Sequence, residues 1–587
     1  MIRSGRFARY DAAAFRKDLV SGILVGIIAI PLGMAFAIAS GVKPEYGIYT
    51  TIVAGVLISL FGGSRFQIGG PTGAFIPILF AIVMQHGYED LLIAGLMAGV
   101  LLVLMGLLRL GSLIKFIPRP VTIGFTSGIA VIIFSGQIPS FLGLKDVQRH
   151  EFFGANMKEI FLHLSTLNFY SVALAAIGLA VILISPRLWP KVPGSLISLL
   201  VTSVIAYVFF RDQVATIGSA YGQISGSLPS VHVPALTWDK IRELAGPAFV
   251  IAMLGSIESL LSAVVADGMT GSRHNSNREL IGQGIANIVT PLFGGIPATG
   301  AIARTATNVR TGAVTPMSGI IHGVFVLVVL LALAPLASHI PLAAMAPILM
   351  MVAWNMSERK EFGRILTSRT SDSLVLLLTF LLTVWTDLTT AVGIGILLAL
   401  LLFVKRMGEM LTVAKVLPDP KIPQSPVSAS IAAEGHGCPQ IEIYTIEGPL
   451  FFGAANMFEK SIMDTIHDRP NVLVLRMGDV PFMDTTGESN LASLVEHFAK
   501  FGGTVLVAEI RTQPMEVIRR TGLYETIGEE RFFDHTGDAI RYALTYLDKK
   551  QCLSCKQAAF RECAGLSQAV PSPDPGAAQP SSAGVSG

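Results

Sequence analysis

The chain has 587 residues, of which 52% are hydrophobic and only 14% are charged. Soluble domains carry about 25% charged residues, so this composition excludes an ordinary soluble protein and indicates a membrane protein. The net charge of +3 is too small to indicate a nucleic-acid partner.

Residues 1–17 form a basic lead-in to the first apolar stretch. Its cations are Arg3, Arg6, Arg9, Arg16 and Lys17. The apolar segment that follows is long and has no small-residue cleavage site, which argues against a cleaved signal peptide. Because cytoplasmic segments are enriched in Lys and Arg, we expect the N-terminus in the cytoplasm of a cell (inner) membrane protein.

Residues 18–408 are predicted to form a polytopic α-helical membrane domain of about fourteen segments. Length and helix breakers place them at 18–40, 47–62, 72–85, 90–110, 119–137, 171–185, 194–210, 244–266, 278–293, 300–311, 317–337, 342–355, 372–388 and 389–407. The polar loop 211–243 is expected outside. An even number of spans, with Lys405 and Arg406 ending the last, puts the C-terminus inside as well.

A short phrase occurs twice within this apolar sequence. Gly69-Gly70-Pro71-Thr72-Gly73-Ala74 is matched by Gly294-Gly295-Ile296-Pro297-Ala298-Thr299-Gly300-Ala301. Glycine and proline end one helix and start the next, so each phrase is predicted to open a half-helix. The unpaired N–H groups and positive dipole of such a start favour anions. Paired breaks in two halves are typical of an inverted-repeat transporter with a midplane site; the alternative is two ordinary turns.

Two charged residues are predicted to lie inside the membrane. Glu258 is the only charge between Glu243 and Asp267, and an ionisable group at mid-span is a functional candidate; the alternative is a protonated or snorkelling carboxyl. Arg304 lies one turn into the second half-helix, on the face of Gly300, where a guanidinium could bind anion oxygens. Its alternative role is a structural salt bridge to Glu258.

Other polar groups of the membrane domain are assigned structural roles. Thr307, Asn308 and Arg310 lie further along the second half-helix and are expected to have a cytoplasmic or gate-side capping role. A further group is expected to form a solvated turn after the Glu258 helix: Asp267, Arg273, His274 and Glu279.

The last region changes character. Residues 409–437 are predicted to be a proline-rich linker. Residues 438–548 alternate strands near 441–444, 472–475 and 503–507 with helices near 454–467, 487–501, 513–521 and 536–547, which indicates a small cytoplasmic α/β domain. The tail 549–587, rich in Ala, Ser, Pro and Gly towards its end, is expected to be disordered.

Searches for cofactor and metal motifs return little. The chain has no phosphate-binding loop of the Gly-x-x-x-x-Gly-Lys-Ser/Thr type and no hydrolase spacing, so it is predicted not to be an enzyme and to need no cofactor or metal. The four cysteines, Cys438, Cys552, Cys555 and Cys563, lie in the cytoplasmic region and are expected as free thiols; the alternative is part of a metal or cluster site.

Several motifs resemble the sulphate permease (SulP) family of anion transporters. They are the runs 26–35, 70–75, 124–128 and 254–261, and most specifically Pro297-Ala298-Thr299-Gly300-Ala301-Ile302-Ala303-Arg304-Thr305-Ala306-Thr307-Asn308. Phe482-Met483-Asp484-Thr485-Thr486-Gly487 resembles a STAS domain, the usual cytoplasmic partner in that family. The resemblance covers roughly residues 14–548. Within the family, the stretch 351–358 is similar to that of the DauA-type bacterial C4-dicarboxylate transporters.

The resemblance implies a seven-plus-seven inverted repeat, a core domain that moves against a gate domain, and a homodimer. It implies an anion site made by Thr72, Gly73, Ala74, Phe75, Thr299, Gly300, Ala301, Ala303 and Arg304. It further implies that Glu258 holds a coupling ion. Either Na⁺, with Ser262 and backbone oxygens near Gly300 as ligands, or a proton fits a carboxylate. In related STAS-like proteins the position of Thr486 is phosphorylated; a helix N-cap is the alternative here.

Two classes of function follow. The first is secondary active transport of a small anion, by symport or exchange, with H⁺ or Na⁺ as the coupling ion. Sulphate, a C4-dicarboxylate such as succinate or fumarate, and bicarbonate all fit, and the sequence does not choose among them. The second is a channel-like or anion-sensing protein that signals to a cytoplasmic partner through its STAS domain.

Overall fold

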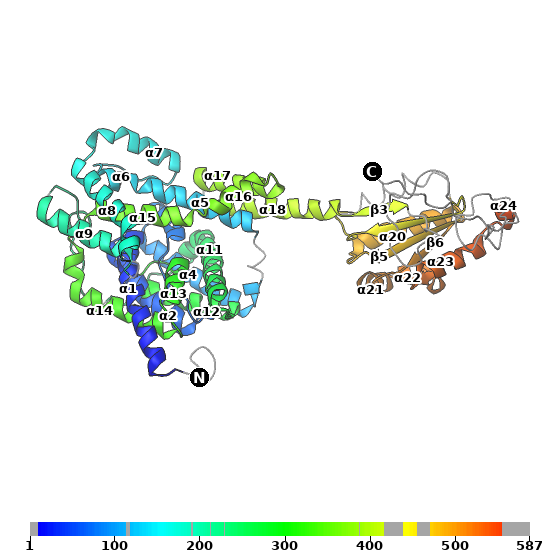
Figure 1. Ribbon diagram of the computed structural model, residues 1–587, viewed down its shortest axis with the longest axis horizontal. Coiled ribbons are helices and arrows are strands. Elements are labelled where there is room, and N and C mark those ends of the chain that lie inside the picture. Colours follow the sequence, from blue (N-terminus) through cyan, green and yellow to red (C-terminus); the bar gives the residue numbers. More distant parts are fainter. Residues whose placement is uncertain are drawn as a thin grey trace, which may run out of the picture. The chain divides into compact units, whose positions relative to one another are not determined.

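The computed structural model describes residues 10–112, 118–189, 192–211, 213–227, 229–386, 388–415, 438–454 and 470–553. The chain forms two compact units, residues 1–399 and 400–587 (Figure 1). The division falls within the last long helix rather than at the predicted boundary after residue 408. The end of this helix packs on the second unit, because a Cβ on Gly408 would lie only 2.5 Å from the Gly453 carbonyl oxygen.

The membrane unit repeats one order of helices. Its first half contains α1 (Ala12–Ala39), α2 (Pro44–Phe61), the 3₁₀ turn η1 (Gly73–Phe75) continued by α3 (Ile76–His86), α4 (Tyr88–Leu107), α5 (Arg119–Gly136), α6 (Ile138–Leu142), α7 (Phe153–Leu162), α8 (Phe169–Leu188) and α9 (Gly194–Phe209). Its second half contains α11 (Trp238–Thr270), α12 (Ser276–Leu292), α13 (Ile302–Arg310), α14 (Met317–Ala337), α15 (Leu342–Met356), α16 (Arg359–Thr367), α17 (Ser371–Trp385) and α18 (Leu388–Glu409). Each of the fourteen predicted segments corresponds to one of these helices.

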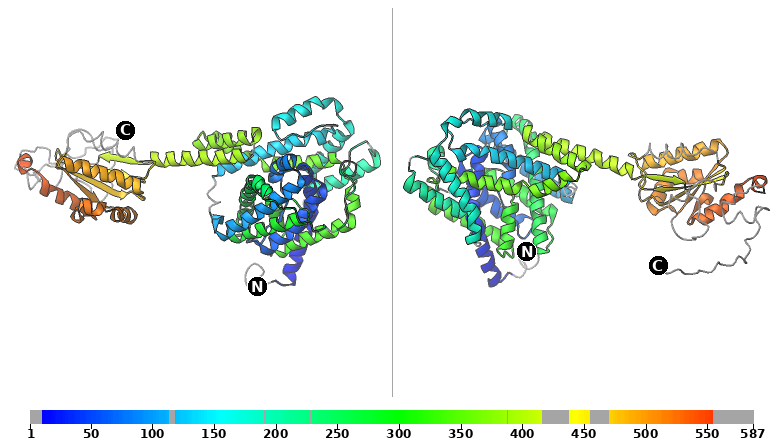
Figure 2. Two further views of the ribbon diagram at one scale, coloured as in Figure 1. Left: turned by 180° about the vertical axis from the view of Figure 1, so that it is seen from behind. Right: turned by 45° about the horizontal axis from the view of Figure 1, so that its top comes forward.

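The helices pack into two bundles. The core bundle is α1–α4 with α11–α14, in which α1 and α2 pack on α14, and α4 packs on α11 and α12. The gate bundle is α5–α9 with α15–α17, in which α5 packs on α15 and α17. Figure 1 shows the gate helices along the upper side of the unit and the core helices below them, and Figure 2 shows the same unit from two other sides. Each bundle therefore takes its helices from both halves of the repeat, and the half-helices α3 and α13 are each third in their half.

Glycines bring the core helices close together. A Cβ on Gly47 of α2 would lie 1.9 Å from the Gly33 carbonyl oxygen of α1, and one on Gly284 of α12 would lie 2.6 Å from the Gly99 carbonyl oxygen of α4. Backbones approach this closely in membrane proteins where small residues line the interface, because lipid gives no hydrophobic drive for helix association.

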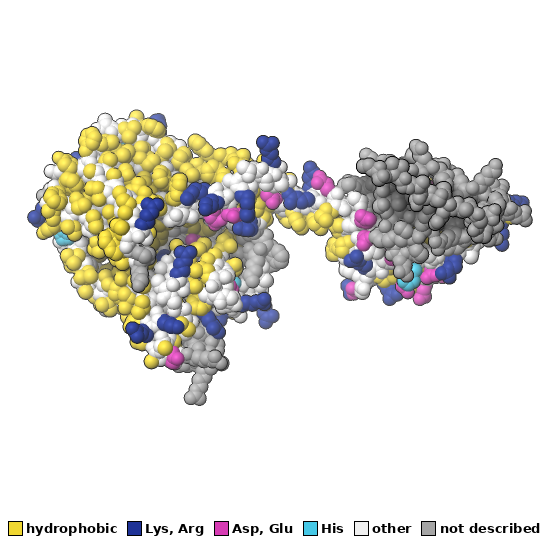
Figure 3. Space-filling view, in the orientation of Figure 1, with side chains coloured by type: hydrophobic (Ala, Val, Ile, Leu, Met, Phe, Trp, Pro, Cys, Tyr) yellow, Lys and Arg dark blue, Asp and Glu magenta, His cyan; other side chains and the backbone are white. Residues whose placement is uncertain are grey.

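Eight described helices are long and apolar enough to cross a bilayer, and three further apolar helices are shorter, including residues 73–86 that form the first half-helix. Figure 3 shows apolar side chains over much of the face made by α8, α9 and α14, with Lys and Arg gathered over α16. The short elements α6, α7, α10 (Ile217–Tyr221) and α16 were not predicted. They lack a long apolar run, which is the signal that revealed the spans.

The second unit is an α/β domain. Its sheet has the order β3-β4-β5-β6-β7, with β3 (Thr412–Lys415) antiparallel to β4 (Ile441–Glu447) and the remaining pairs parallel. The other strands are β5 (Val472–Asp479), β6 (Thr504–Ala508) and β7 (Phe532–Phe533), and the helices include α20 (Thr485–Lys500), α21 (Thr512–Thr521), α22 (Leu523–Ile527) and α23 (Thr536–Ala543). Apolar side chains cover both faces of the sheet.

Two sequence predictions for this unit need comment. The linker prediction for 409–437 is wrong at its start, because residues 412–415 pair with 444–447 as an edge strand. A strand of four residues has too short an alternation of apolar and polar side chains to be distinguished from a linker by sequence. The predicted helix 454–467 falls mainly outside the described residues, and so do the rest of the linker and the tail beyond residue 553.

Candidate functional site

A two-residue β-bridge joins the two half-helix starts in the core bundle. β1 (Gly69–Gly70) is antiparallel to β2 (Thr299–Gly300), with Gly69 opposite Gly300 and Gly70 opposite Thr299. The Ala301 amide also donates to the Ile68 carbonyl at 2.8 Å. Both repeated phrases are therefore paired in space, as a midplane site requires. The first N–H groups of η1–α3 and of α13 have no partner within their own helix and carry partial positive charge.

Glu258 of α11 contacts the start of the first half-helix. The Thr72 hydroxyl donates to Glu258 Oε2 at 2.8 Å, and Thr72 is the residue that immediately precedes η1. Among the described residues, no other donor to this half-buried carboxylate is present. The Glu258 carboxylate therefore lies beside the start of the first half-helix.

The second half-helix start is also held by α11. The Ser259 and Thr299 hydroxyls are 2.6 Å apart, and the Gly300 amide donates to Ser259 Oγ at 3.1 Å. Thr299 in turn donates to the Gly255 carbonyl at 3.1 Å. Ser259 did not figure among the predicted site residues, although it lies inside the 254–261 motif. One helix, α11, thus contacts both half-helix starts through neighbouring residues.

Arg304 lies behind the bridge rather than against Glu258. Its side chain is 2% exposed, and its Nη2 donates to the Pro71 carbonyl in the first phrase. No ion pair between Arg304 and Glu258 is present, so the structure does not support the predicted alternative of a direct salt bridge. Nη1 has no hydrogen-bond partner among the described residues and lies against Gly70, where a Cβ would approach it to 2.7 Å.

Apolar side chains surround the first turn of η1. A Cβ on Gly73 would be 3.5 Å from Ile133 of α5, 3.6 Å from the Met356 sulfur of α15 and 3.7 Å from Phe36 of α1. Phe75 is 1% exposed and packs against Gly255. The gate bundle therefore supplies one wall beside the first half-helix. Ile133 and Met356 were not predicted as site residues, since isolated apolar residues in apolar helices give no sequence signal.

A cavity of about 960 Å³ reaches this wall. It lies between the two bundles, and its lining includes Ile76 at the start of α3, Ile133 of α5 and Ala39 at the end of α1. Its lining also includes Phe153 and Ile160 of α7, and it comes close to Gly73, which packs beside Ile133. Its inner end therefore approaches the first half-helix start from one side of the unit.

The remaining predicted site residues occupy varied positions. Ala74 and Ala301 are buried next to the bridge, whereas Ala303 is exposed. Ser262 is one turn beyond Glu258, but its hydroxyl donates to Thr305 Oγ1 at 3.1 Å, which in turn accepts from the Ile68 amide. Ser262 thus ties α11 to α13 and to the bridge in this structure.

Two buried polar residues near the bridge escaped prediction. Both Gln67 amide atoms and both His322 ring nitrogens lack hydrogen-bond partners of good geometry among the described residues. Gln67 fills the space beside Gly300, where a Cβ would lie 1.7 Å from its Nε2, and His322 of α14 packs on Gly55 of α2. Neither residue belongs to a recognisable motif, so only the fold reveals them.

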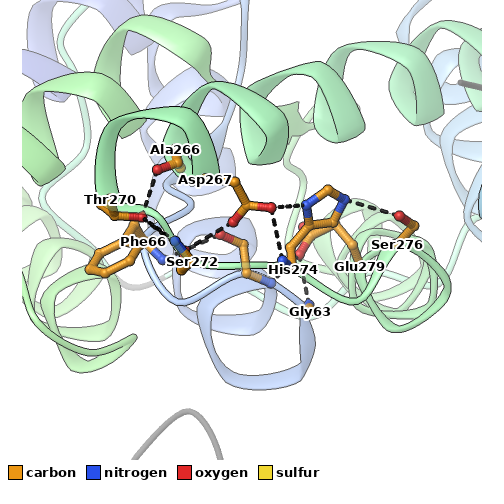
Figure 4. Close-up of polar contacts among 10 residues, drawn as sticks. Gly63, Phe66, Ala266, Asp267, Thr270, Ser272, His274, Ser276 and Glu279 are labelled. Atoms are coloured by element: carbon orange, nitrogen blue, oxygen red, sulfur yellow. Dashed lines mark hydrogen bonds and ion pairs between the residues drawn. The ribbon is translucent and has the colours of Figure 1, made fainter.

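The turn after α11 is solvated only in part: Arg273 is exposed as predicted, whereas the His274 and Glu279 side chains are buried. The His274 side chain is 4% exposed, its Nδ1 lies 2.7 Å from Asp267 Oδ2, and its Nε2 lies 3.0 Å from Ser276 Oγ (Figure 4). Glu279 is fully buried and accepts from the Gly63 amide at 2.6 Å. The Phe-Gly-Gly turn, residues Phe61-Gly62-Gly63, can pack closely on the start of α12 because Gly63 has no side chain; a Cβ there would lie 2.0 Å from the Asn275 carbonyl oxygen. Tertiary packing thus buries two side chains, His274 and Glu279, of a charged segment that looks exposed in sequence.

Asn308 has a different role from the capping that was predicted. It is fully buried; its Nδ2 donates to the Phe66 carbonyl and to Ser318 Oγ, and its Oδ1 accepts from Ser21 Oγ at 2.7 Å. Asn308 thereby connects α13 to α1, to α14 and to the segment before β1. The sequence of an amphipathic half-helix does not show which distant side chains and carbonyls a polar residue on it will contact.

In the second unit, Asp484 and not Thr486 caps α20. The Asp484 side chain accepts from the amides of Thr486 and Gly487, which leaves the exposed Thr486 hydroxyl outside the cap. Cys438 and Cys552 pack beside the same apolar cluster, while Cys555 and Cys563 lie outside the described residues.

Comparisons with known proteins agree with this architecture. The family model described as "Sulfate permease family" matches residues 15–379, and that of the STAS domain matches residues 433–539. YvdB of Bacillus subtilis (strain 168), a candidate sulfate transporter by name, is 53% identical over 532 residues, which is 91% of this chain and 98% of YvdB. The bicarbonate transporter BicA of Picosynechococcus sp. is 30% identical over 544 residues, or 90% of this chain and 94% of BicA.

Solved structures show the same fold. The overall structure of SLC26A9 superposes with a TM-score of 0.82 over 92% of each chain at 18% identity, which bears on the fold alone. The transmembrane domain of a cyanobacterial BicA superposes with a TM-score of 0.60 at 30% identity, covering 67% of this chain and 98% of that one. None of these comparisons shows a particular likeness to DauA. The chain belongs to the sulfate permease family of multi-pass anion transporters, which are not enzymes, and it carries the C-terminal STAS domain.

Proposed function

We propose that the protein is a secondary active transporter of small oxyanions, located in the cell (inner) membrane with both termini in the cytoplasm. The single observation that carries the proposal is the bridge between β1 and β2. It brings two half-helix starts together beside the Glu258 carboxylate, which accepts one hydrogen bond, from Thr72. Sulphate is the first candidate substrate, with bicarbonate and C4-dicarboxylates such as succinate as competitors. No cofactor is required.

The anion site of this proposal is made by the first N–H groups of both half-helices. Thr72, Gly73, Ala74 and Phe75 supply one side, and Thr299, Gly300, Ala301, Ala303 and Arg304 supply the other. Arg304 adds a full positive charge and has one donor nitrogen without a partner. A desolvated anion is stabilised there by helix dipoles and a buried cation together.

The proposed transport movement follows from the two bundles. Every residue of the anion site belongs to the core bundle, whereas the wall beside Gly73 comes partly from α5 and α15 of the gate bundle. Sliding of the core bundle along the gate bundle would carry the site from the side of the present cavity to the opposite face, an elevator-like form of alternating access. A homodimer joined through the gate bundles, with the STAS domain free to bind a cytoplasmic partner, completes the proposal.

Coupling is assigned to Glu258, with a proton or Na⁺ as the coupling ion. Ser262 and the Gly300 backbone would assist Na⁺, although the Ser262 hydroxyl is engaged with Thr305 in this structure. An isolated carboxylate at membrane depth is costly unless it serves an ion pathway. Purified protein in liposomes should therefore take up labelled sulphate against its gradient when a proton or Na⁺ gradient is imposed.

The test uses two comparisons in those liposomes. Unlabelled sulphate, succinate and bicarbonate compete against the labelled anion to rank the substrates, and imposed H⁺ and Na⁺ gradients are compared to identify the coupling ion. Glu258→Gln should abolish gradient-driven uptake, while Glu89→Gln, an identical change at the exposed outer end of α4, should retain it. Concentrative uptake by Glu258→Gln at the wild-type rate would contradict the proposal.

A further inference from the structure

Three carboxylates inside the core bundle, those of Glu279, Asp18 and Glu258, differ in how many hydrogen bonds they accept. Glu279 accepts three hydrogen bonds, from the Gly63 and Ser64 amides and from Gln283. Asp18 accepts from the Val314 and Thr315 amides and from the Thr315 hydroxyl. Each of these buried carboxylates is thus compensated by its own local donors and serves the fold. Glu258 receives one hydrogen bond, from Thr72, and its second oxygen has no donor among the described residues.

The charge near the bridge can be summed from the elements that meet there. Each half-helix start contributes about half a positive charge, so the pair contributes about +1. Arg304 contributes +1, because its guanidinium stays protonated and its contact with the neutral Pro71 carbonyl cancels no charge. An ionised Glu258 contributes −1, which leaves a net charge of about +1 facing the anion.

The sum changes when Glu258 is neutralised. A proton on the carboxylate, or a sodium ion bound to it, raises the net charge near the bridge to about +2. Since an uncompensated charge away from water is costly, a site of about +1 favours a monoanion and a site of about +2 favours a dianion.

We propose that the charge state of Glu258 sets the valence of the anion that the site binds: a monoanion while the carboxylate is bare, and a dianion once it holds a proton or a sodium ion. The proposal rests on the proposed anion site and extends it, because it names the class of substrate that accompanies each coupling state.

Other titratable groups do not offer the same control. From the elements packed on α11, Arg304 of α13 is the charged group near Glu258. At the inner end, the Glu279 carboxylate of α12 already has its own hydrogen-bond donors. At the outer end, Glu89 of α4 pairs with His232 and Asp90 pairs with Lys240. His86 of α3 pairs there with Glu243. His322 of α14 is buried near the bridge, but its ring packs on Gly55 of α2. Glu258 is therefore the described group whose ionisation directly changes the charge beside Thr72.

The experiment compares sulphate with perchlorate, because both are tetrahedral oxyanions of similar size that differ in charge. Binding of each to the purified full-length protein is measured by displacement of labelled sulphate in sodium-free buffer at mildly acidic and mildly alkaline pH. The readout is the ratio of sulphate affinity to perchlorate affinity. In the wild type this ratio should rise on acidification by about tenfold or more, and sodium at alkaline pH should raise it if Na⁺ is the coupling ion.

The variants separate the charge of Glu258 from other effects. Glu258→Gln should hold the ratio high at both pH values, about tenfold or more above the alkaline wild type, and Glu258→Asp should retain the pH dependence. Glu89→Gln removes a carboxylate outside the site and should leave the ratio as in the wild type. Should Glu258→Gln fail to fold, Arg304→Gln provides a second test, because loss of one positive charge should move the ratio towards perchlorate.

The outcomes distinguish this inference from the proposed function. A Glu258→Gln protein with the ratio of the alkaline wild type would overturn the valence control, even if the same variant has lost gradient-driven uptake as the proposed function expects. A wild type that binds neither anion and takes none up would overturn the proposed function and the inference together.

Discussion

The Thr72 hydroxyl donates to Glu258 at 2.8 Å across a sequence separation of 186 residues. This contact joins the start of the first half-helix to the helix that also holds the second, through Ser259, Thr299 and Gly300. An ion that binds to Glu258 and an anion that binds at the half-helix starts would therefore act on the same few groups. Coupling between the two ligands needs no long pathway in this arrangement.

Thr72→Val should weaken this link without changing charge or shape. We expect the apparent affinity for the coupling ion to change several-fold, because the carboxylate loses its one described donor, a neutral-to-charged hydrogen bond of about 1.5–3 kcal/mol. Uptake in liposomes at varied H⁺ or Na⁺ concentration measures the effect, and Thr72→Ser, which keeps the hydroxyl, is the matched control. Identical ion dependence in Val and Ser variants would show that the contact is incidental.

Arg304→Ala should weaken substrate binding by about 1–3 kcal/mol, the scale of a charge-assisted hydrogen bond. Arg304→Lys tells the two roles of the side chain apart. If the charge matters, Lys should retain most of the affinity. If the contact with the Pro71 carbonyl matters, Lys should bind as poorly as Ala, because it lacks the second nitrogen of the fork. Displacement of labelled sulphate measures the affinity of each variant and distinguishes the two roles. Unchanged affinity in both variants would show that Arg304 does not take part in anion binding.

Gly300→Ala should disrupt the bridge through a defined neighbour. The new Cβ would lie 1.7 Å from Gln67 Nε2, and Gln67 is buried beside it. We expect lower thermal stability and lower anion affinity, since overpacking of a filled interior typically costs about 1–3 kcal/mol. The double variant Gly300→Ala with Gln67→Ala should recover both properties. A double variant no better than Gly300→Ala would show that the loss arises elsewhere, for example at the helix start itself.

The fold could be predicted from sequence to the extent that apolar length and helix breakers mark it. The fourteen membrane segments and the paired Gly-Pro phrases are such marks, and Glu258 stands out because charge is rare at that depth. The family resemblance supplied the rest of the architecture. Strand β3 and helix α16 were missed, since each is too short or too polar to give a periodic signal.

The site could be predicted only in part, because contacts between distant segments leave no local trace. Nothing in the sequence shows that Arg304 contacts the Pro71 carbonyl, or that Met356 and Ile133 lie beside Gly73. The error over Glu279 has the same origin. A carboxylate in a charged segment is normally solvated, and only the close approach of the Phe-Gly-Gly turn supplies the amides that bury it.

The pairing of β3 with β4 leads to a prediction about the second unit. A fragment of residues 408–553 should be more stable than one of residues 438–553, because the shorter fragment exposes the edge of β4 that residues 412–415 cover. Denaturant unfolding of the two fragments measures the difference. A matched control is the longer fragment with Val413→Pro, which cannot pair normally and should resemble the shorter one. Equal stability of all three would show that β3 is dispensable.

Deleting residues 410–587, which follow the end of α18, should leave the order of substrate preference unchanged. Every proposed anion-binding residue lies between Thr72 and Arg304, within the membrane unit. Lower yield or rate is expected, because the STAS domain is then missing. The competition series of sulphate, succinate and bicarbonate, repeated on the truncated protein in liposomes, measures the preference. A changed order among the three anions would mean that the STAS domain helps to shape the site.

Glu509 should make the stability of the second unit depend on pH. Burial alone would raise the pKa of Glu509, but hydrogen bonds from Thr536 and the charge of Arg476 outweigh burial and place its pKa below the ordinary value. A carboxylate with a lowered folded-state pKa adds stability that is fully present above its unfolded pKa, about 4.3, and is lost as pH falls through the folded-state pKa. Acid should therefore destabilise this unit in part through Glu509.

Glu509→Gln in the 408–553 fragment should reduce the free energy of unfolding at neutral pH by about 1 kcal/mol, since the side chain is partly exposed and its hydrogen bonds are screened. The same substitution should flatten the decline below about pH 4, because the titrating group is gone. Glu496→Gln, an exposed position on α20, makes the identical chemical change and should leave the profile as in the wild type. Denaturant unfolding across this pH range measures all three proteins. If the Glu509→Gln and wild-type profiles run parallel into acid, the contacts with Thr536 and Arg476 do not control the titration.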